Sequence, residues 1–426
     1  MHLGNVRLVF LSMIAAATTC SAAVVEQVCV RQMWPWHEKV RIDYTLAGEI
    51  GELSDITVKV RDVTGNELKP LVSSFSGDLL EVLPGERVIW WNPAEAGIEI
   101  GNKQLTFTLE AEADPQRYCV IDISVTNEYK VTYHEKAPDG GWNTDEYKTT
   151  KIVFRHVKPG TFMMGTPADE AGRRTENGTG SEENHVRDMD RHKVTLTQDY
   201  WLGIFPLTFK QASIVQESEF GKTGTYVAHQ KDSSPAVKLS IKNMLGMKNK
   251  DDPNPTPASW YAAPIPLEGS WLYKLNAGIT EGALPQGTHL AIPTEAQWEY
   301  ACRAGTSSAY GNGTDSIEGI GPVVPNSKPM YPVGGYAPNA WGFYDMHGCV
   351  WQWAIDSYSG YKSGGNDLTD PYNPMTSVSY WPALRGGSYG VSSTPNRDNR
   401  SGSRYYKTYS VSDGYLGARI AIVKAP

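Results

Sequence analysis

The sequence predicts two parts: a small all-β domain, followed by a larger domain rich in loops and poor in helices. A chain of 426 residues is long enough for two or three domains of roughly 150 residues each. Its 41 glycines and 27 prolines indicate many turns. Only one segment has a convincing helical pattern, whereas short strand-like runs recur near the N-terminus.

The N-terminal region alternates apolar and polar residues in short runs between Val24 and about residue 114. Breakers such as Leu83-Pro84-Gly85 separate the runs, and this spacing is typical of an antiparallel sandwich. The clearest runs are 40–44, 56–60, 88–91 and 105–109. We expect a β-sandwich over 24–114 that acts as a spacer or adhesion module, a linker with a strand over 115–150, and a second domain over 151–426.

The one predicted helix of the second domain begins after Thr294. Thr294 as N-cap with Gln297 three residues later forms a capping-box pattern, and Trp298, Ala301 and Cys302 then share one helical face. The rest of this region lacks regular periodicity, so we expect loops and aromatic packing to hold it together.

Charge and the N-terminal segment limit the partners and the location. The formal net charge of −8 argues against a nucleic-acid partner, because phosphate backbones are anionic. A short basic start, an apolar run over 8–17 and small residues at 21–23 predict a signal peptide over 1–23, so we expect a periplasmic or extracellular protein, with Cys20 as a less favoured lipoprotein anchor. No later stretch is long and apolar enough to span a membrane. The short signal and the mixture of domains are typical of a bacterial protein.

Export would place Cys29, Cys119, Cys302 and Cys349 in an oxidising compartment. Four cysteines allow three connectivities, and Cys29 with Cys119 is the most natural pair because it would join the ends of the first domain. Four unpaired thiols remain the alternative.

Several strings in the second domain resemble the formylglycine-generating enzymes, also called sulfatase-modifying factors. They are 159–165 (PGTFMMG), 192–196 (HKVTL), 292–300 (IPTEAQWEY), 342–348 (GFYDMHG), 384–389 (LRGGSY) and the closing 417–420 (GARI). The resemblance implies a loop-rich α+β fold related to C-type lectins for 151–426. It does not extend to the first domain.

The resemblance also implies a copper-dependent oxidase with two active-site thiols, which convert a sulfatase cysteine to formylglycine. Thiolates suit a soft cuprous ion, whereas oxygen ligands do not. The two positions are Val391 and Asn396 in this chain. We therefore expect that copper is not bound and that the chain is not a formylglycine-generating oxidase.

Two further sites follow from the resemblance. The first is a binding cleft for a peptide or glycan, with an arginine-rich floor: Trp351, Ser388, Tyr389, Asn396, Arg400 and Arg404. The second is a calcium site with oxygen ligands from Asp345, Gly348, Val350 and Gln352, weakened because the family's usual glutamate is Gln352 here. The arginines could instead tie loops together by bonding backbone carbonyls.

Other patterns have competing interpretations. Cys302 matches a family cysteine that is normally in a disulfide, but its partner position is Ser401, so Cys302 could pair with the additional Cys349 or stay a buried thiol. His185, Asp188, Asp190 and His192 could bind zinc or iron, although the charged sequence around them favours a surface loop.

Three functions therefore compete. The leading one is an exported protein that resembles sulfatase-modifying factors and binds a peptide or glycan without copper chemistry. The second is an oxidoreductase of the superfamily of formylglycine-generating and non-haem-iron enzymes that uses a different metal. The third is a structural surface protein. The oligomeric state is left open.

Overall fold

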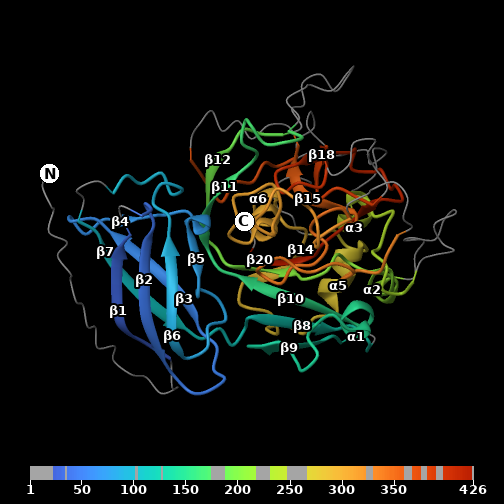
Figure 1. Cartoon of the computed structure of the whole chain (residues 1–426). Helices are drawn as coiled ribbons and strands as arrows, with labels where there is room; N and C mark the ends of the chain where they lie inside the picture. The colour runs from blue at the N-terminus through green and yellow to red at the C-terminus, as the bar shows by residue number, and fades with distance from the viewer. Residues whose placement is uncertain are drawn as a thin grey trace, which may run out of the picture. The chain divides into compact units, whose positions relative to one another are not determined.

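The computed structural model describes residues 23–33, 36–100, 104–125, 128–173, 188–216, 231–246, 266–322, 330–358, 367–375, 381–389 and 397–424. The chain divides into two compact units, Met1–Gln116 and Arg117–Pro426. Figure 1 traces both units, the first in blue. Each unit has its own hydrophobic core and is treated by itself below.

The first unit consists of two antiparallel sheets with the strand orders β1-β2-β6-β5 and β4-β3-β7. Its elements are β1 (Val24–Gln32), β2 (Val40–Ala47), β3 (Asp55–Arg61), β4 (Glu67–Leu68), a 3-10 turn (Val72–Ser74), β5 (Phe75–Gly77), β6 (Gly85–Trp91) and β7 (Thr106–Glu112). The predicted runs correspond to β2, β3, β6 and β7.

The inward-facing side chains of β2 form part of the core of this unit, and they alternate strictly along the strand. Residues 40, 42, 44 and 46 are buried and those between them are half-buried, as expected for a strand with one face inward. They pack with residues of the other sheet, including Val60 and Leu109. Trp91 closes the core against the rings of Phe75 and Phe107, at centroid distances of 6.1 and 5.4 Å.

The second unit contains sheets of six, four and three strands. Their orders are β14-β20-β13-β10-β8-β9, β18-β17-β15-β19 and β11-β12-β16. The strands are β8 (Tyr118–Asp122), β9 (Lys130–His134), β10 (Lys151–Val157), β11 (Gly160–Met164), β12 (His192–Leu196), β13 (Tyr200–Gly203), β14 (Thr288–Ala291), β15 (Trp351–Ser357), β16 (Leu368–Thr369), β17 (Pro382–Arg385), β18 (Arg404–Tyr406), β19 (Leu416–Gly417) and β20 (Ala421–Lys424).

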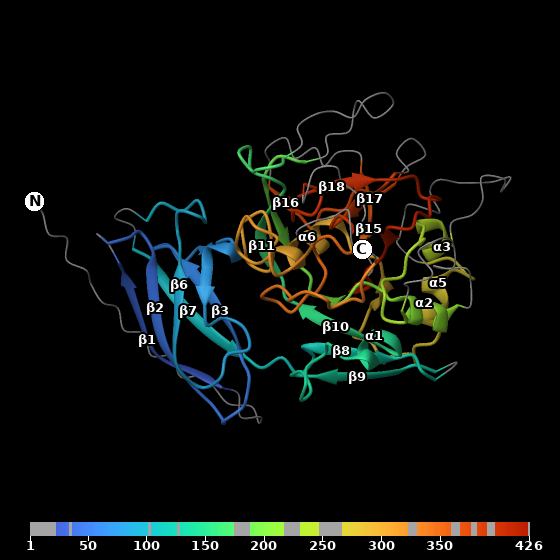
Figure 2. The same ribbon diagram turned by 45° about the vertical axis from the view of Figure 1, so that its right-hand side comes forward.

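The stretch 115–150, expected to be a linker with a strand, contributes two strands to the six-stranded sheet. β8 pairs with both β9 and β10, and Figure 2 shows these strands side by side with α1 near them. Cys119 and Ile121 on β8 are completely buried. The unit boundary accordingly falls at Gln116, before β8.

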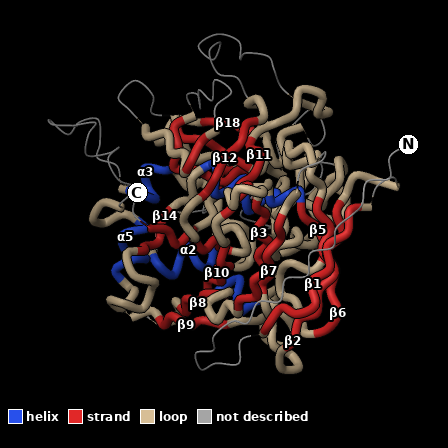
Figure 3. The backbone as a smooth tube through the Cα atoms, turned by 90° about the vertical axis from the view of Figure 1, so that its left-hand side faces the viewer, coloured by secondary structure: helices blue, strands red, loops and turns tan. Residues whose placement is uncertain are grey.

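The described helices of this unit are short: α1 (Asp145–Thr149), α2 (Phe209–Val215), α3 (Ile241–Leu245), α5 (Trp271–Ala277) and α6 (Glu295–Arg303). Figure 3 shows them as small blue segments among strands and long tan loops. The predicted α+β, loop-rich fold class is confirmed. No helix in the described ranges has the length and apolar composition that a membrane crossing requires.

Helix α6 has the N-terminus that the sequence predicts. Thr294 accepts the Gln297 backbone N–H at 3.1 Å, and the Gln297 side chain accepts the Thr294 N–H at 2.9 Å. Trp298, Ala301 and Cys302 are completely buried, as their common face requires. α2 begins with the same kind of box between Thr208 and Gln211, which the sequence interpretation overlooked.

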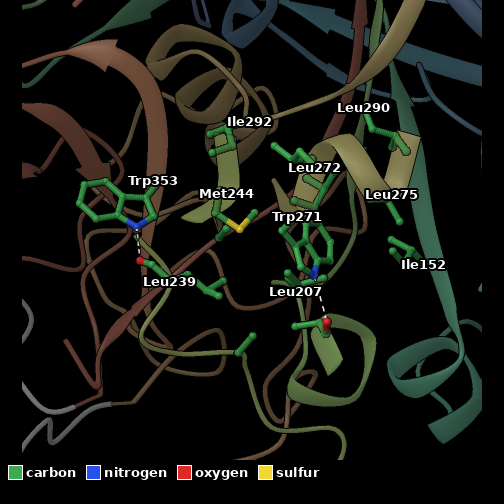
Figure 4. Packing of buried hydrophobic residues seen from close by; sticks show 14 of the residues in the cluster. Ile152, Leu207, Leu239, Met244, Trp271, Leu272, Leu275, Leu290, Ile292 and Trp353 are labelled. Atoms are coloured by element: carbon green, nitrogen blue, oxygen red, sulfur yellow. Dashed lines mark hydrogen bonds between the residues drawn. The ribbon is translucent and has the colours of Figure 1, made fainter. Parts of the chain in front are cut away.

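The main core of the second unit gathers around two tryptophans that satisfy their own polar groups. The Trp271 indole donates to the Ala212 carbonyl at 2.9 Å, and the Trp353 indole donates to the Leu239 carbonyl at 2.6 Å. Figure 4 shows both rings among aliphatic side chains from several helices and strands. These two rings can be buried because their indole N–H groups have carbonyl acceptors.

The capping box gives a direct stability test. Thr294→Ala removes the acceptor for the Gln297 N–H and should lower the free energy of unfolding by about 1 kcal/mol. Thr294→Ser keeps a hydroxyl and is the control. Urea unfolding measures both variants; equal losses for Ala and Ser would show that the hydroxyl is not what stabilises the helix.

Candidate functional site

A cluster of buried arginines and glutamates joins α6 to strands β17 and β18. Arg385 on β17 donates to Glu299 and lies 3.4 Å from a Glu295 oxygen, while Arg404 on β18 donates to Glu295 through Nε at 2.6 Å. Arg303 donates to Glu299 at 2.8 Å. The side chains of these five residues are at most 2% exposed. Buried charges of this kind require partners, and here each charge has one.

Glu299 is the central acceptor of this cluster. Burial opposes its ionisation, but Arg303 and Arg385 outweigh burial and hold the pKa of Glu299 below its usual 4.5. The Gly165 N–H also donates to this carboxylate at 2.8 Å, which connects the end of β11 to α6. The cluster therefore fixes α6, β17 and the loop after β11 relative to one another.

Arg400, predicted to lie on a cleft floor, is also in a buried ion pair. It donates to Glu170 and, at 2.6 Å, to Asp188, and a third bond reaches the Gly172 carbonyl at 3.0 Å. Arg404 is held by Glu295 as described above. Both arginines therefore tie segments of the chain together, which is the structural alternative considered for them from the sequence.

The other predicted cleft residues lie in and next to β15 and β17. The Trp351 ring is buried and stands 5.4 Å from the Tyr405 ring. The Tyr389 hydroxyl donates to the Gly414 carbonyl at 3.0 Å. Ser388 is 1% exposed, and among the described residues its hydroxyl has no hydrogen-bond partner. Asn396, like Val391 at the other copper position, lies outside the described residues.

Two glycines with left-handed backbone, Gly348 before β15 and Gly387 after β17, make room for the Asn399 side chain. Gly348 and Gly387 have φ of 88° and 68°. A Cβ on Gly348 would lie 2.6 Å from the Asn399 amide nitrogen, and one on Gly387 would overlap the Asn399 amide oxygen. The Asn399 carbonyl in turn accepts a hydrogen bond from the His347 Nδ1 atom at 2.7 Å. Only glycine permits this packing, because both the backbone conformation and the space exclude a side chain.

The calcium ligands implied by the resemblance are not equivalent in the structure. Asp345 is 2% exposed, and one carboxylate oxygen accepts the Gly334 N–H at 2.6 Å, whereas the other has no partner among the residues described. Gln352 is different: its amide oxygen accepts the Trp298 indole at 2.8 Å and the Arg419 guanidinium at 2.9 Å. An oxygen with two donors has no lone pair left for an ion, so these four residues do not fit calcium as a set. Calcium binding by the chain stays a prediction.

Burial controls the charge of Asp345. It raises the pKa of this carboxyl to about 6, against the Gly334 N–H and Arg419, which lower it. Arg419 itself donates to Gln352, to the Gly203 carbonyl at 2.7 Å and to the Tyr344 carbonyl at 2.6 Å. The Arg419 cation thus stabilises the charged Asp345 carboxylate electrostatically, although its own hydrogen bonds go to other residues.

All four described cysteines are free thiols. The predicted pairs Cys29–Cys119 and Cys302–Cys349 are therefore wrong, and the alternative of unpaired thiols holds for these residues. Cys29 belongs to β1 of the first unit and Cys119 to β8 of the second. Burial raises the pKa of Cys119 and of Cys302 to about 12 and also raises the pKa of Cys349, so these three thiols stay protonated.

Cys302 and His347 form a buried contact. The Cys302 sulfur lies 3.6 Å from the His347 Nε2 atom, which also accepts the Gly311 N–H at 3.1 Å. Burial lowers the pKa of His347 to about 4, so the ring is neutral. The His347 Nε2 lone pair is already engaged by the Gly311 N–H, and with a thiol pKa of about 12 against a ring pKa of about 4 the Cys302 proton is not transferred to the ring.

The acidic and histidine residues before β12 do not converge on a metal position. Asp188 bonds Arg400, and Asp190 pairs with Arg173. The His192 Nδ1 atom contacts the Asp190 carbonyl at 2.9 Å, and His185 lies outside the described residues. Within the described ranges no group of three or more His, Cys, Asp or Glu side chains could hold a metal ion.

The fold and the buried arginine cluster define a loop-rich α+β domain stabilised by internal ion pairs. Residues 143–424 match the family model described as "Sulfatase-modifying factor enzyme 1-like domain". This match covers more than half of the 426 residues, so the chain belongs to that family. The resemblance of the second domain is thereby confirmed.

Individual relatives have lower similarity. The formylglycine-generating enzyme of Streptomyces coelicolor is 31% identical over 145 residues, which are 30% of this chain and 46% of that enzyme. The mouse enzyme is 28% identical over 151 residues, 32% of this chain and 40% of that protein. Serine/threonine-protein kinase pkn1 of Chlamydia pneumoniae is 23% identical over 351 residues, 76% of this chain and 51% of the kinase. The chain thus spans about half, or less, of these curated relatives.

Two solved structures are also similar. PvdO from Pseudomonas aeruginosa has a TM-score of 0.47 and 22% identity, covering 63% of this chain and 94% of that one. Treponema denticola variable protein 1 has a TM-score of 0.45 and 18% identity, covering 64% and 95%.

The ion pairs of Arg400 give the second stability test. Arg400→Ala leaves Glu170 and Asp188 without their cation and should lower the free energy of unfolding by about 3–5 kcal/mol. Lys193→Ala is the matched control, because its pair with Asp367 is exposed, at 40% and 63% of the side chains, and should cost at most about 1 kcal/mol. Similar small losses for both variants would contradict a structural role for Arg400.

Glu299 gives a pH test. Its pKa is lower in the folded chain than its usual 4.5, so its stabilising contribution is present above that value and is lost as the pH falls. Glu299→Gln should therefore lose less stability than the original chain between about pH 5 and 3. Urea unfolding at a series of pH values measures this difference, and parallel curves would contradict it.

Proposed function

We propose that this chain is an exported member of the sulfatase-modifying-factor family that binds a peptide or glycan and does not generate formylglycine. The observation that carries the proposal is the pair Val391 and Asn396 at the positions where the family resemblance implies two thiols. Neither side chain can act as a thiolate toward a cuprous ion.

The placement of the other cysteines supports this view. Cys119, Cys302 and Cys349 are buried, and burial raises the pKa of each thiol. Cys29 lies in the first unit, outside the matched residues 143–424. None of the described cysteines therefore offers the thiolate pair that copper chemistry in the family requires.

A neutral ligand suits the candidate cleft better than an anion does. Arg400 and Arg404 already have carboxylate partners, so an incoming anion would have to displace Glu170, Asp188 or Glu295. Aromatic rings at β15, β17 and β18 offer another means of recognition: Tyr405 lies half-buried beside Trp351, and Trp381 stacks on Tyr406 at 5.1 Å. Sugar rings and peptide side chains both pack well on such rings.

The copper part of the proposal has a direct assay. A peptide with the sulfatase pattern Cys-x-Pro-x-Arg, incubated with this protein, copper and oxygen, should keep its mass. The Streptomyces coelicolor enzyme, run in parallel, is the positive control. Conversion of the cysteine to the aldehyde by this protein, seen by mass spectrometry, would overturn the proposal.

Export and binding are tested separately. The intact mass of protein recovered from expressing cells should correspond to a chain starting near Val24. Saturable binding to a panel of neutral oligosaccharides and peptides should be lost in Tyr405→Ala while the unfolding transition remains cooperative. A chain that retains residues 1–23, or no binding to any panel member, contradicts the corresponding part.

A further inference from the structure

The outer face of the four-stranded sheet in the first unit carries two arginines and an indole ring in one row. Residues of β1, β2 and β6 that alternate with the core residues point away from the core. Near one end of these strands Arg31 is opposite Arg41, and Arg41 is opposite Trp90. The next strand, β5, places the exposed Ser76 opposite Trp90. A small residue therefore follows the ring on the side away from the arginines.

The Trp90 ring is half-buried, and neighbouring side chains hold it in place. The Arg41 guanidinium lies 5.5 Å from the ring centroid, and the His37 ring lies at 5.4 Å with its plane tilted by 60°. The indole N–H of Trp90 has no acceptor among the described residues. Trp36, the chain neighbour of His37, is 82% exposed. The loop between β1 and β2 therefore adds a second indole at the same end of the sheet.

The two arginines share a single carboxylate. Arg31 donates to one oxygen of Asp43, and the Nε atom of Arg41 donates to the other at 2.9 Å. The arginine side chains are 53% and 36% exposed, and their N–H groups that do not face Asp43 have no acceptor in the described part of the chain. Two cations with one anion leave one positive charge, which the carboxylate of a ligand would balance.

We propose that this row of side chains binds an acidic glycan, with one uronic acid residue at Trp90. The apolar C–H face of the sugar ring packs on the indole, and the sugar carboxylate accepts hydrogen bonds from Arg31 and Arg41. Indole and guanidinium groups supply donors, so they suit a ligand rich in acceptor oxygens. A peptide backbone fits less well, because its N–H groups would find only the carboxylate of Asp43, which the arginines already use.

The local charge outweighs the overall acidity of the chain at this position. The formal net charge is −8, but at physiological ionic strength exposed charges more than about 8 Å away are largely screened. A nucleic acid would need many cations along its backbone, whereas one uronic acid residue needs only the arginine pair. The proposed site belongs to the first unit, outside the matched residues 143–424, and shares no residue with the candidate cleft.

The test uses calorimetry with the full-length protein, a galacturonic acid oligomer and the methyl ester of the same oligomer. The acid should bind saturably, and the uncharged ester should bind at least about tenfold more weakly. Trp90→Ala and Arg31→Ala should each weaken binding of the acid by at least about tenfold. Arg61→Ala is the control, because Arg61 lies on β3 of the other sheet with its side chain 36% exposed, as that of Arg41 is. Tyr405→Ala should also leave this affinity unchanged, which separates the site from the candidate cleft.

Several results would overturn the proposal. They are no saturable binding of the acid, equal affinity for acid and ester, binding that Trp90→Ala and Arg31→Ala leave unchanged, or binding lost in Tyr405→Ala, which would assign the sugar to the second unit. Equal affinity for a glutamate oligomer would show that an acidic peptide is recognised by charge alone. If Trp90→Ala does not unfold cooperatively, Arg31→Ala decides, because an exposed ion pair contributes little to folding.

Discussion

The second unit depends on the ion pairs that hold helix α6 to β17 and β18. Glu295 and Glu299 are completely buried, as is Arg385, and such charges are tolerable only where each has an opposite charge and further hydrogen bonds. These contacts join residues that are about 90 to 110 positions apart in the chain. In a fold with five short described helices, ion pairs of this kind provide order that regular secondary structure does not.

The cluster also explains what holds the arginines that the sequence placed on a cleft floor. Every arginine predicted to recognise a ligand is a structural tie in this chain, with its guanidinium directed at a carboxylate or a carbonyl. Under the proposed function, ligand recognition would rest on rings near β15 and β18. The loop before β15 and the turn after β17 are similarly fixed, since Gly348 and Gly387 pack against Asn399 and leave no space for a side chain of their own.

Sequence patterns predicted those features of the fold that are determined by neighbouring residues. The alternation of β2 and the capping box of α6 correspond directly to the structure, because strand faces and helix caps are set by neighbouring residues. β8 and β9 were harder to predict: β8 pairs with β10 and β9 pairs with β8, which depends on tertiary contacts, and only one strand was expected in that stretch. The capping box of α2 could also have been predicted from the sequence, but the sequence interpretation did not include it.

The site was less predictable because its character depends on partners distant in sequence. The sequence around an arginine looks the same whether its side chain contacts a ligand or Glu170. The sequence around a cysteine likewise does not show whether the thiol is paired or free. The family resemblance implies two properties together, a scaffold and a pair of active-site thiols. The ion pairs and glycines preserve the scaffold without reference to any thiol, so the scaffold can persist whatever chemistry the loops carry. Asp345 belongs to one of those loops, and one of its buried carboxylate oxygens has no hydrogen-bond partner among the described residues, unlike the carboxylates of the ion-pair cluster.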